Sequence, residues 1–197
     1  VAGRPGNVSV FQCEGIVARD CAGTADYMTN ANAVLTAAPI TMACWANGDS
    51  VTTLQTLMAV EQDAKAGNGF RLRLAGNVGG DPLRAYSDTQ FATTSTGFTA
   101  GVWFHGCAVF TSTTSRTVYI DGGSSGSGTD LAAPLLLDST NLGISTPAQA
   151  DNDFDGRLAE AAIWDVALTA AEVASLAKGF CPLFIRPASL VAYWPLW

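Results

Sequence analysis

Acidic side chains two residues apart are the first groups in this chain that could do chemistry. Glu61 and Asp63 would lie on one face of a strand, because side chains alternate along it. A retaining glycosidase needs two carboxylates about 5 Å apart. This pair sits beside Lys65 at a predicted strand end, where a solvated loop is the simpler interpretation. We therefore assign no catalytic residue here.

The only histidine, His105, is the other residue that could act as a base. Cys107 lies two residues further along the same predicted strand, so both side chains project from one face. That arrangement suits nucleophilic catalysis. The alternative is a structural role for both residues within an apolar strand. A metal site built from several histidines is excluded, because the chain has one.

Residues 151–156, Asp-Asn-Asp-Phe-Asp-Gly, imitate the start of an EF-hand calcium loop. Such a loop carries a bidentate Glu at its twelfth position, which is Ala162 here, so the EF-hand interpretation fails. Asp151 and Asp153 remain the expected ligands if calcium binds at this loop. A solvated acidic loop is the alternative, and no other cofactor is expected.

Charge and composition restrict the partners. The net charge is −7 and Lys and Arg are not clustered, which disfavours nucleic acid and anionic membranes. Apolar runs stop well short of the roughly 20 residues that span a bilayer. Charged residues make up only 14%, against roughly 25% in soluble domains. We interpret this as a hint that partner subunits cover part of the surface, and a Ser/Thr-rich secreted domain is the alternative.

The five cysteines form no C-x-x-C pair, so neither a zinc site nor a redox motif is indicated. Cys44 and Cys107 fall in predicted core strands, where a free thiol acts as a small hydrophobe. A bridge between Cys13 and Cys21 remains open.

The strands that must position these groups begin with residues 40–46. Large side chains occupy both faces of this stretch: Ile40, Met42 and Cys44 on one, Thr41, Ala43 and Trp45 on the other. This pattern predicts a central strand covered on both sides. Further strands are predicted at 54–60, 70–74, 83–86, 91–98, 102–110, 117–120, 135–137, 142–144 and 157–164. Three buried strands far apart in sequence predict two stacked antiparallel sheets.

Several local signals refine this picture. In residues 70–74 the arginines should point out and the apolar residues in. The Asp121-Gly122-Gly123 sequence predicts a tight hairpin turn, and residues 122–128 a flexible Gly/Ser loop. Thr169 and Glu172 form a capping box, which predicts one short helix that ends near Gly179.

The segments outside the body are predicted to be arms. We divide the chain into an N-terminal arm (1–25), a body (26–180) and an apolar C-terminal arm (181–197). An aromatic tail of this kind must lie against the body or a neighbour. The expected interface residues are Phe180, Leu183, Phe184, Ile185, Tyr193, Trp194 and Trp197.

Read together, these pieces resemble the laminin G-like branch of the concanavalin A-like superfamily. The resembling elements, in order, are Thr41–Trp45, Gly69–Leu72, Trp103–His105, Tyr119–Gly122, Phe154–Gly156 and Ala167–Glu172. The resemblance implies an all-β, concanavalin A-like jelly-roll sandwich with one short C-terminal helix. The tail from Ile185 to Leu196 is similar to the end of laminin G-like proteins found in bacteriophage virions.

The resemblance also bears on the sites. The glucanase branch carries Glu-x-Asp-x-x-Glu, whereas the third place here falls at Ala66, so catalysis is not expected. The strand of His105 matches one in which the histidine is structural. Calcium at the rim of a sheet is common in the family, which is why Asp151 and Asp153 are kept as candidates.

We expect a non-enzymatic protein of a phage virion, a capsid decoration or cement protein on the virion surface. Its partners would be the major capsid protein, other virion proteins and copies of itself in a homo-oligomer. The alternative is a carbohydrate-binding, lectin-like module of a tail adhesin or a secreted protein, which would bind surface glycans.

Overall fold

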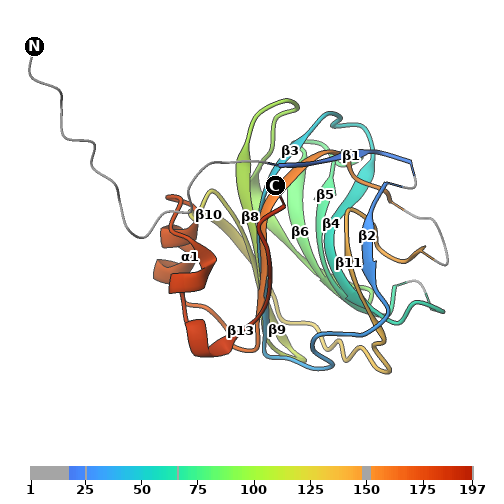
Figure 1. The fold of residues 1–197 in the computed structure, drawn as a ribbon, viewed down its shortest axis with the longest axis vertical. Coiled ribbons are helices and arrows are strands. Elements are labelled where there is room, and N and C mark those ends of the chain that lie inside the picture. Colours follow the sequence, from blue (N-terminus) through green and yellow to red (C-terminus); the bar gives the residue numbers. More distant parts are fainter. Residues whose placement is uncertain (1–17, 25, 66, 148–151, 197) are drawn as a thin grey trace, which may run out of the picture.

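The computed structural model describes residues 18–24, 26–65, 67–147 and 152–196. These residues form two stacked antiparallel sheets with one α-helix at the side (Figure 1). The expected all-β jelly-roll sandwich with a short C-terminal helix is confirmed. Among the described residues, no helix is long and apolar enough to cross a membrane.

One of the two layers is a six-stranded sheet. Its strand order is β2 (Met28–Asn30), β11 (Ser139–Leu142), β4 (Leu54–Glu61), β5 (Gly69–Ala75), β6 (Pro82–Ser87) and β7 (Gln90–Gly97).

The seven-stranded sheet contains the predicted central strand. Its order is β1 (Arg19–Ala22), β12 (Asp155–Trp164), β3 (Ile40–Gly48), β8 (Phe104–Ser112), β9 (Ser115–Ile120) and β10 (Ser124–Gly128), with β13 (Leu190–Trp194) also paired to β12. Because β3 occupies one edge of β12, β1 and β13 share the other. Two stretches predicted as arms therefore supply edge strands.

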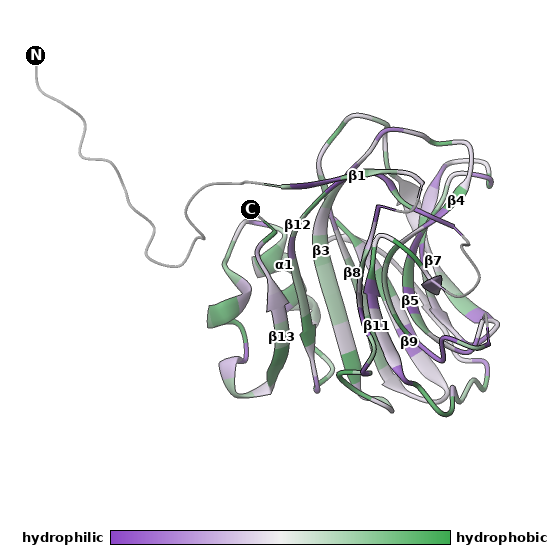
Figure 2. Cartoon of the chain, turned by 45° about the vertical axis from the view of Figure 1, so that its right-hand side comes forward, coloured by the Kyte–Doolittle hydropathy of each residue, from purple (hydrophilic) through white to green (hydrophobic). Residues whose placement is uncertain are grey.

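Strand β3 is covered on both faces, as its sequence predicts. Ile40, Met42 and Cys44 are fully buried in the core between the sheets. On the outer face, Ala43 packs under helix α1 (Ala170–Leu176) with Val173 of that helix. Figure 2 shows hydrophobic residues both along β12 and in the neighbouring α1.

Helix α1 begins as the capping box predicts. The Thr169 hydroxyl accepts a hydrogen bond from the Glu172 backbone N–H, and the Glu172 carboxylate accepts one from the Thr169 N–H at 2.8 Å. Val173 and Leu176 are its buried residues. Short 3₁₀ turns follow at η2 (Pro182–Phe184) and η3 (Pro187–Ser189).

The hairpin prediction at Asp121 is confirmed, but the loop predicted after it is wrong. Asp121 and Gly122 have φ of 51° and 69° and join β9 to β10. Residues 124–128 are a strand because serine and glycine let it approach β7 closely. A Cβ on Gly126 would lie 1.7 Å from the Thr93 carbonyl oxygen.

Three other expectations need correction. Residues 135–137 form no strand, and Leu135 and Leu136 are exposed on the loop before β11. Strand β11 covers 139–142 rather than 142–144. Trp103, expected inside a core strand, is half-buried and precedes β8.

Candidate functional site

One row of side chains crosses the outer face of the six-stranded sheet. The strand register places opposite one another, from β2 to β7, Thr29, Asn141, Ala59, Arg71, Tyr86 and Phe91. A second row on the same face runs through Thr56, Arg73, Arg84 and Thr93. Their strand neighbours Val60, Leu72 and Ala85 point into the core, so these two rows look outward.

The half of this face formed by β11, β4 and β5 is covered. Arg71 and Arg73 do point away from the core, as predicted, but only 3% and 6% of each is exposed. Residues 144–146 are buried and contact the outward side chains: the Asn141 amide donates to the Ser145 carbonyl oxygen at 2.7 Å. We name this part the covered half.

A buried ion pair lies at the centre of the covered half. The Arg71 Nε is 3.0 Å from Glu61 Oε1, and the Ser145 hydroxyl donates to the same oxygen at 2.8 Å. Arg73 donates to Ser145 Oγ at 2.8 Å and to Thr56 Oγ1 at 3.0 Å. A carboxylate with these partners and no exposed surface is not available to a substrate as an acid or base.

The other half of the face, formed by β6 and β7, is open; we name it the open half. The Phe91 ring is 41% exposed and lies 5.0 Å from the half-buried Tyr86 ring, measured between centroids. The Arg84 guanidinium sits 4.2 Å above the Phe91 ring centroid and donates from Nη1 to the Tyr86 hydroxyl at 3.2 Å. Two aromatic rings and a fixed cation therefore meet on an accessible surface.

The sequence analysis did not single out Arg84, Tyr86 or Phe91. The available signal was the alternation Leu83-Arg84-Ala85-Tyr86, which puts a cation and an aromatic ring on the polar face of one strand. Phe91 could not be added, because its place opposite Tyr86 depends on the register of the β6–β7 hairpin.

His105 and Cys107 are placed where a structural role is expected. His105 is buried, its ring meets Trp45 edge-on with centroids 5.5 Å apart, and burial lowers its pKa to about 3. Burial also raises the pKa of the Cys107 thiol, so no thiolate nucleophile forms at neutral pH. The dyad hypothesis is therefore not supported by its surroundings.

The cysteines settle one open question. Cys21 is a free, buried thiol, so it forms no disulfide with Cys13, the possibility that the sequence left open. Burial raises the pKa of the Cys21 thiol to about 11. Cys44 and Cys107 are also free and buried, as predicted. Cys181 is disulfide-bonded.

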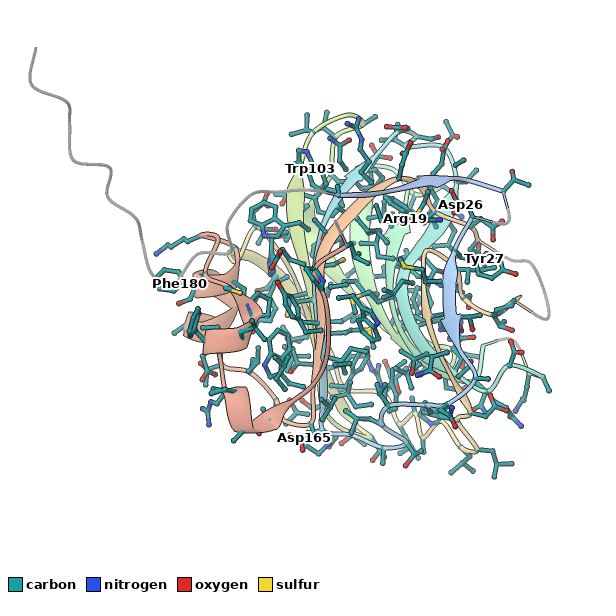
Figure 3. All side chains as sticks on the ribbon, in the orientation of Figure 1. Arg19, Asp26, Tyr27, Trp103, Asp165 and Phe180 are labelled. Carbon is teal, nitrogen blue, oxygen red and sulfur yellow. The ribbon has the colours of Figure 1, made fainter. Side chains whose placement is uncertain are left out.

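The C-terminal tail lies against the body of its own chain. Tyr193 donates to the Glu160 carboxylate at 2.6 Å, and Trp164 Nε1 donates to the Ile185 carbonyl oxygen at 2.7 Å. Trp194 packs on the inter-sheet core, and Phe180 lies half-buried beside α1 (Figure 3). Of the expected interface residues, Leu183 and Phe184 are exposed by 49% and 52%. Trp197 lies outside the described residues.

Glu160 and Asp165, the other acidic pair, are not brought together for catalysis. Burial raises the pKa of Glu160, and its hydrogen bond from Tyr193 opposes that shift. Asp165 lies just beyond the end of β12 and is exposed. Glu160 therefore acts in docking the tail.

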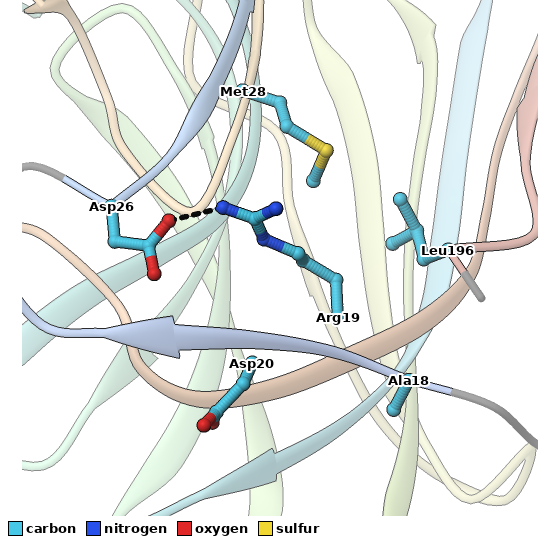
Figure 4. A pocket seen from close by; sticks show the side chains of 6 residues that line it. All are labelled: Ala18, Arg19, Asp20, Asp26, Met28 and Leu196. Atoms are coloured by element: carbon cyan, nitrogen blue, oxygen red, sulfur yellow. Dashed lines mark hydrogen bonds and ion pairs between the residues drawn. The ribbon is translucent and has the colours of Figure 1, made fainter.

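A shallow depression of about 590 Å³ lies between β1, β2 and the C-terminal end (Figure 4). Its walls are Ala18, Arg19, Asp20, Asp26, Met28 and Leu196. Arg19 and Asp26 form an ion pair across it, and that hydrogen bond is the largest cause of the lowered Asp26 pKa. Because the two charges already satisfy each other, this depression is a weaker ligand site than the open half.

Of the two residues expected to bind calcium, Asp151 and Asp153, only Asp153 lies within the described residues. Asp151 is not described, and Asp153 lines an open depression of about 530 Å³ with Asn77, Asn152 and Thr52 among its neighbours. These oxygens are of the kind that calcium prefers, but a site needs six to eight ligands. In the described part of the chain, no group of three or more His, Cys, Asp or Glu side chains comes together to hold a metal. The described residues alone do not complete a calcium site.

The sandwich and its open half define a class of protein: a lectin-type, two-sheet β domain in which half of one outer sheet face is accessible. The family model for the concanavalin A-like lectin/glucanases superfamily, of the laminin G type, matches residues 22–174. The chain therefore belongs to this superfamily, as its sequence indicated. No curated protein matches it by sequence.

Three solved structures illustrate the likeness. A heptameric pentraxin from Limulus polyphemus has a TM-score of 0.68 and 14% identity, over 80% of each chain. Domain 4 of an extracellular arabinanase from Geobacillus stearothermophilus, in complex with arabinotriose, has a TM-score of 0.60 and 22% identity, over 77% of this chain and 72% of that one. Tailspike protein 2 of an Escherichia coli O157:H7 bacteriophage has a TM-score of 0.60 and 18% identity, over 87% of this chain but 25% of its own. At these identities the likeness is one of fold.

Proposed function

We propose that this chain is a non-catalytic carbohydrate-binding module and that the open half of the six-stranded sheet is its binding surface. The observation that carries this proposal is the exposed Phe91 ring next to Tyr86, with the Arg84 guanidinium over the Phe91 ring and hydrogen-bonded to the Tyr86 hydroxyl. Aromatic side chains supply a large apolar contact area, and a few placed polar groups orient the ligand. Sugar rings, with one apolar face and many hydroxyls, suit such a surface.

The comparisons support this interpretation better than capsid decoration. The arabinanase domain that shares the fold is described with arabinotriose bound, and the superfamily is one of lectins and glucanases. The buried, ion-paired state of Glu61 argues against a glucanase-like reaction on this face. The similarity to a phage tailspike covers a quarter of that protein, so the virion assignment stays a prediction.

The position of the tail points the same way. The expected interface placed the residues of the C-terminal tail against neighbouring subunits, yet Ile185, Tyr193 and Trp194 pack within the chain itself. The exposed remainder is Leu183 and Phe184. Contacts of these two residues with a capsid protein or a second copy are still proposals.

We also propose that the protein works outside the cell, secreted or on the surface of a particle. The disulfide at Cys181 supports this location, because structural disulfides persist in oxidising compartments.

The test is a glycan array followed by calorimetry on the best ligand, with Phe91→Ala as the test variant. Phe184→Ala is the matched control, since it removes the same side chain with similar exposure elsewhere on the surface. We expect Phe91→Ala to weaken binding by about tenfold or more, which corresponds to about 1.4 kcal/mol. Phe184→Ala should leave binding unchanged. If the natural protein binds no glycan, or both variants bind equally, the proposal is wrong.

A further inference from the structure

We infer that the open half recognises sugars that carry a carboxylate, and that Arg84 is the residue that binds this group. The inference deepens the proposed function and rests on it. Three features of Arg84 support it: its fixed position, its unused donors and its missing counter-charge.

The guanidinium of Arg84 is held in place before any ligand arrives. The Phe91 ring supports one face at 4.2 Å, and the Tyr86 hydroxyl fixes Nη1 at 3.2 Å. Since Tyr86 lies two residues along the same strand and Phe91 stands opposite Tyr86 on β7, the side chain loses little further freedom on binding. A pre-organised donor binds more tightly than a mobile one, because less conformational entropy is lost.

Most donors of this guanidinium are unused. An arginine has five N–H donors, and among the described residues Arg84 makes one hydrogen bond, to Tyr86. Its Nε is buried without a hydrogen-bond partner in the described part of the chain. The terminal nitrogens Nη1 and Nη2 are therefore the part of the guanidinium that is left for a ligand, and Nη2 makes no hydrogen bond in the described residues. These two nitrogens can donate in parallel to the two oxygens of a carboxylate without any movement of the side chain.

Arg84 also lacks a charge partner, unlike Arg71 on the adjacent strand. Arg71 is paired with Glu61, and elsewhere in the fold Arg19 is paired with Asp26 and Arg186 with Glu172. In the described residues no acidic side chain forms an ion pair with Arg84, although the chain has 17 Asp and Glu against 10 Lys and Arg. An acidic protein that holds a cation without an ion pair beside the exposed Phe91 ring and the half-buried Tyr86 ring has a surface complementary to an anionic sugar.

The planar guanidinium edge favours a carboxylate over other anions on sugars. A carboxylate presents two coplanar oxygens that match the Nη1–Nη2 end of the guanidinium, whereas a sulfate ester is tetrahedral and offers this match only in part. We therefore assign uronic and sialic acids as the ligand class, and sulfated sugars become a separate arm of the test.

The experiment compares ligands on the unmodified protein first. A glycan array carries sialic-acid and uronic-acid oligosaccharides, each beside its carboxyl-reduced counterpart, together with sulfated galactosides. Calorimetry then measures the best acidic oligosaccharide and its reduced form. We expect the acidic form to bind at least tenfold more tightly than the reduced form.

Variants then assign the effect to Arg84. Arg84→Gln should bind the acidic and reduced forms with equal affinity, and Arg84→Lys should recover part of the difference. Arg157→Gln, an exposed arginine on the other sheet, is the matched control and should behave as the natural protein. Thermal unfolding of each variant checks that the fold is intact.

The outcomes separate this inference from the proposed function. If the protein binds neutral glycans and their acidic forms equally well, the inference is wrong and the proposed function stands. If sulfated glycans bind and carboxylates do not, the assigned ligand class is wrong. If no glycan binds, both the inference and the proposed function fall.

Discussion

Single residues on this molecule differ mainly in whether the environment leaves them reactive. His105 illustrates the point: its strand position could be predicted, and its neutral state follows from burial between the sheet and Trp45. The sequence shows that the chain has no second histidine that could act together with His105. It does not show that His105 is shielded from solvent, because burial on the outer face of the sheet depends on the packing of segments that are distant in sequence.

The buried state of His105 leads to a testable pH dependence. Burial lowers its folded pKa to about 3, against an ordinary value of 6.5, so the unfolded chain binds the proton more tightly. Stability should therefore fall as the pH drops from 6.5 towards 3, by up to about 1.4 kcal/mol per pH unit. Urea unfolding between pH 4 and 8, for the natural protein and His105→Gln, measures this difference.

The variant serves as the internal control, because every other titrating group is common to both proteins. The difference in unfolding free energy between them should be flat above pH 6.5 and should change steadily below it. Parallel profiles over the whole range would mean that His105 is protonated equally easily in both states, contrary to the buried position described above.

At the scale of elements, periodicity predicted most strands because alternation reports which face is buried. The stretches at 40–46, 70–74 and 157–164 became β3, β5 and β12. Strand β10 was not predicted because a run of Ser and Gly shows no alternation of apolar and polar side chains. Its glycines are present because the strand packs directly against the β7 backbone, a tertiary contact that no local pattern encodes.

This explanation of β10 predicts the effect of a single methyl group. Gly126→Ala would put a Cβ 1.7 Å from the Thr93 carbonyl oxygen, so β10 and β7 must separate. We expect a loss of about 1–3 kcal/mol in unfolding free energy, the usual cost of overpacking. Gly79→Ala is the control, since a Cβ there meets nothing within 4 Å. Denaturant unfolding of both variants makes the comparison, and equal stability would contradict the close approach.

At the scale of the whole molecule, the ordered set of strands was enough to predict the superfamily but not the site. The fold depends on which residues are apolar, and the sequence displays that directly. The site depends on register across six strands and on residues 144–146, which contact Glu61 and Arg73 while Phe91 stays exposed on the open half. Coverage of one half and exposure of the other is a property of the assembled sandwich.

Two regions of the assembled molecule could bind a glycan, and metal removal distinguishes them. A site at the Asp153 depression would need calcium to bridge sugar hydroxyls to protein oxygens. A site on the open half needs no metal, because the Arg84 guanidinium pairs with a carboxylate directly. We therefore expect EDTA to leave the calorimetric affinity for the acidic oligosaccharide unchanged. Asp153→Asn should also leave this affinity unchanged. If EDTA abolishes binding and added calcium restores it, the glycan binds at the Asp153 depression and not on the open half.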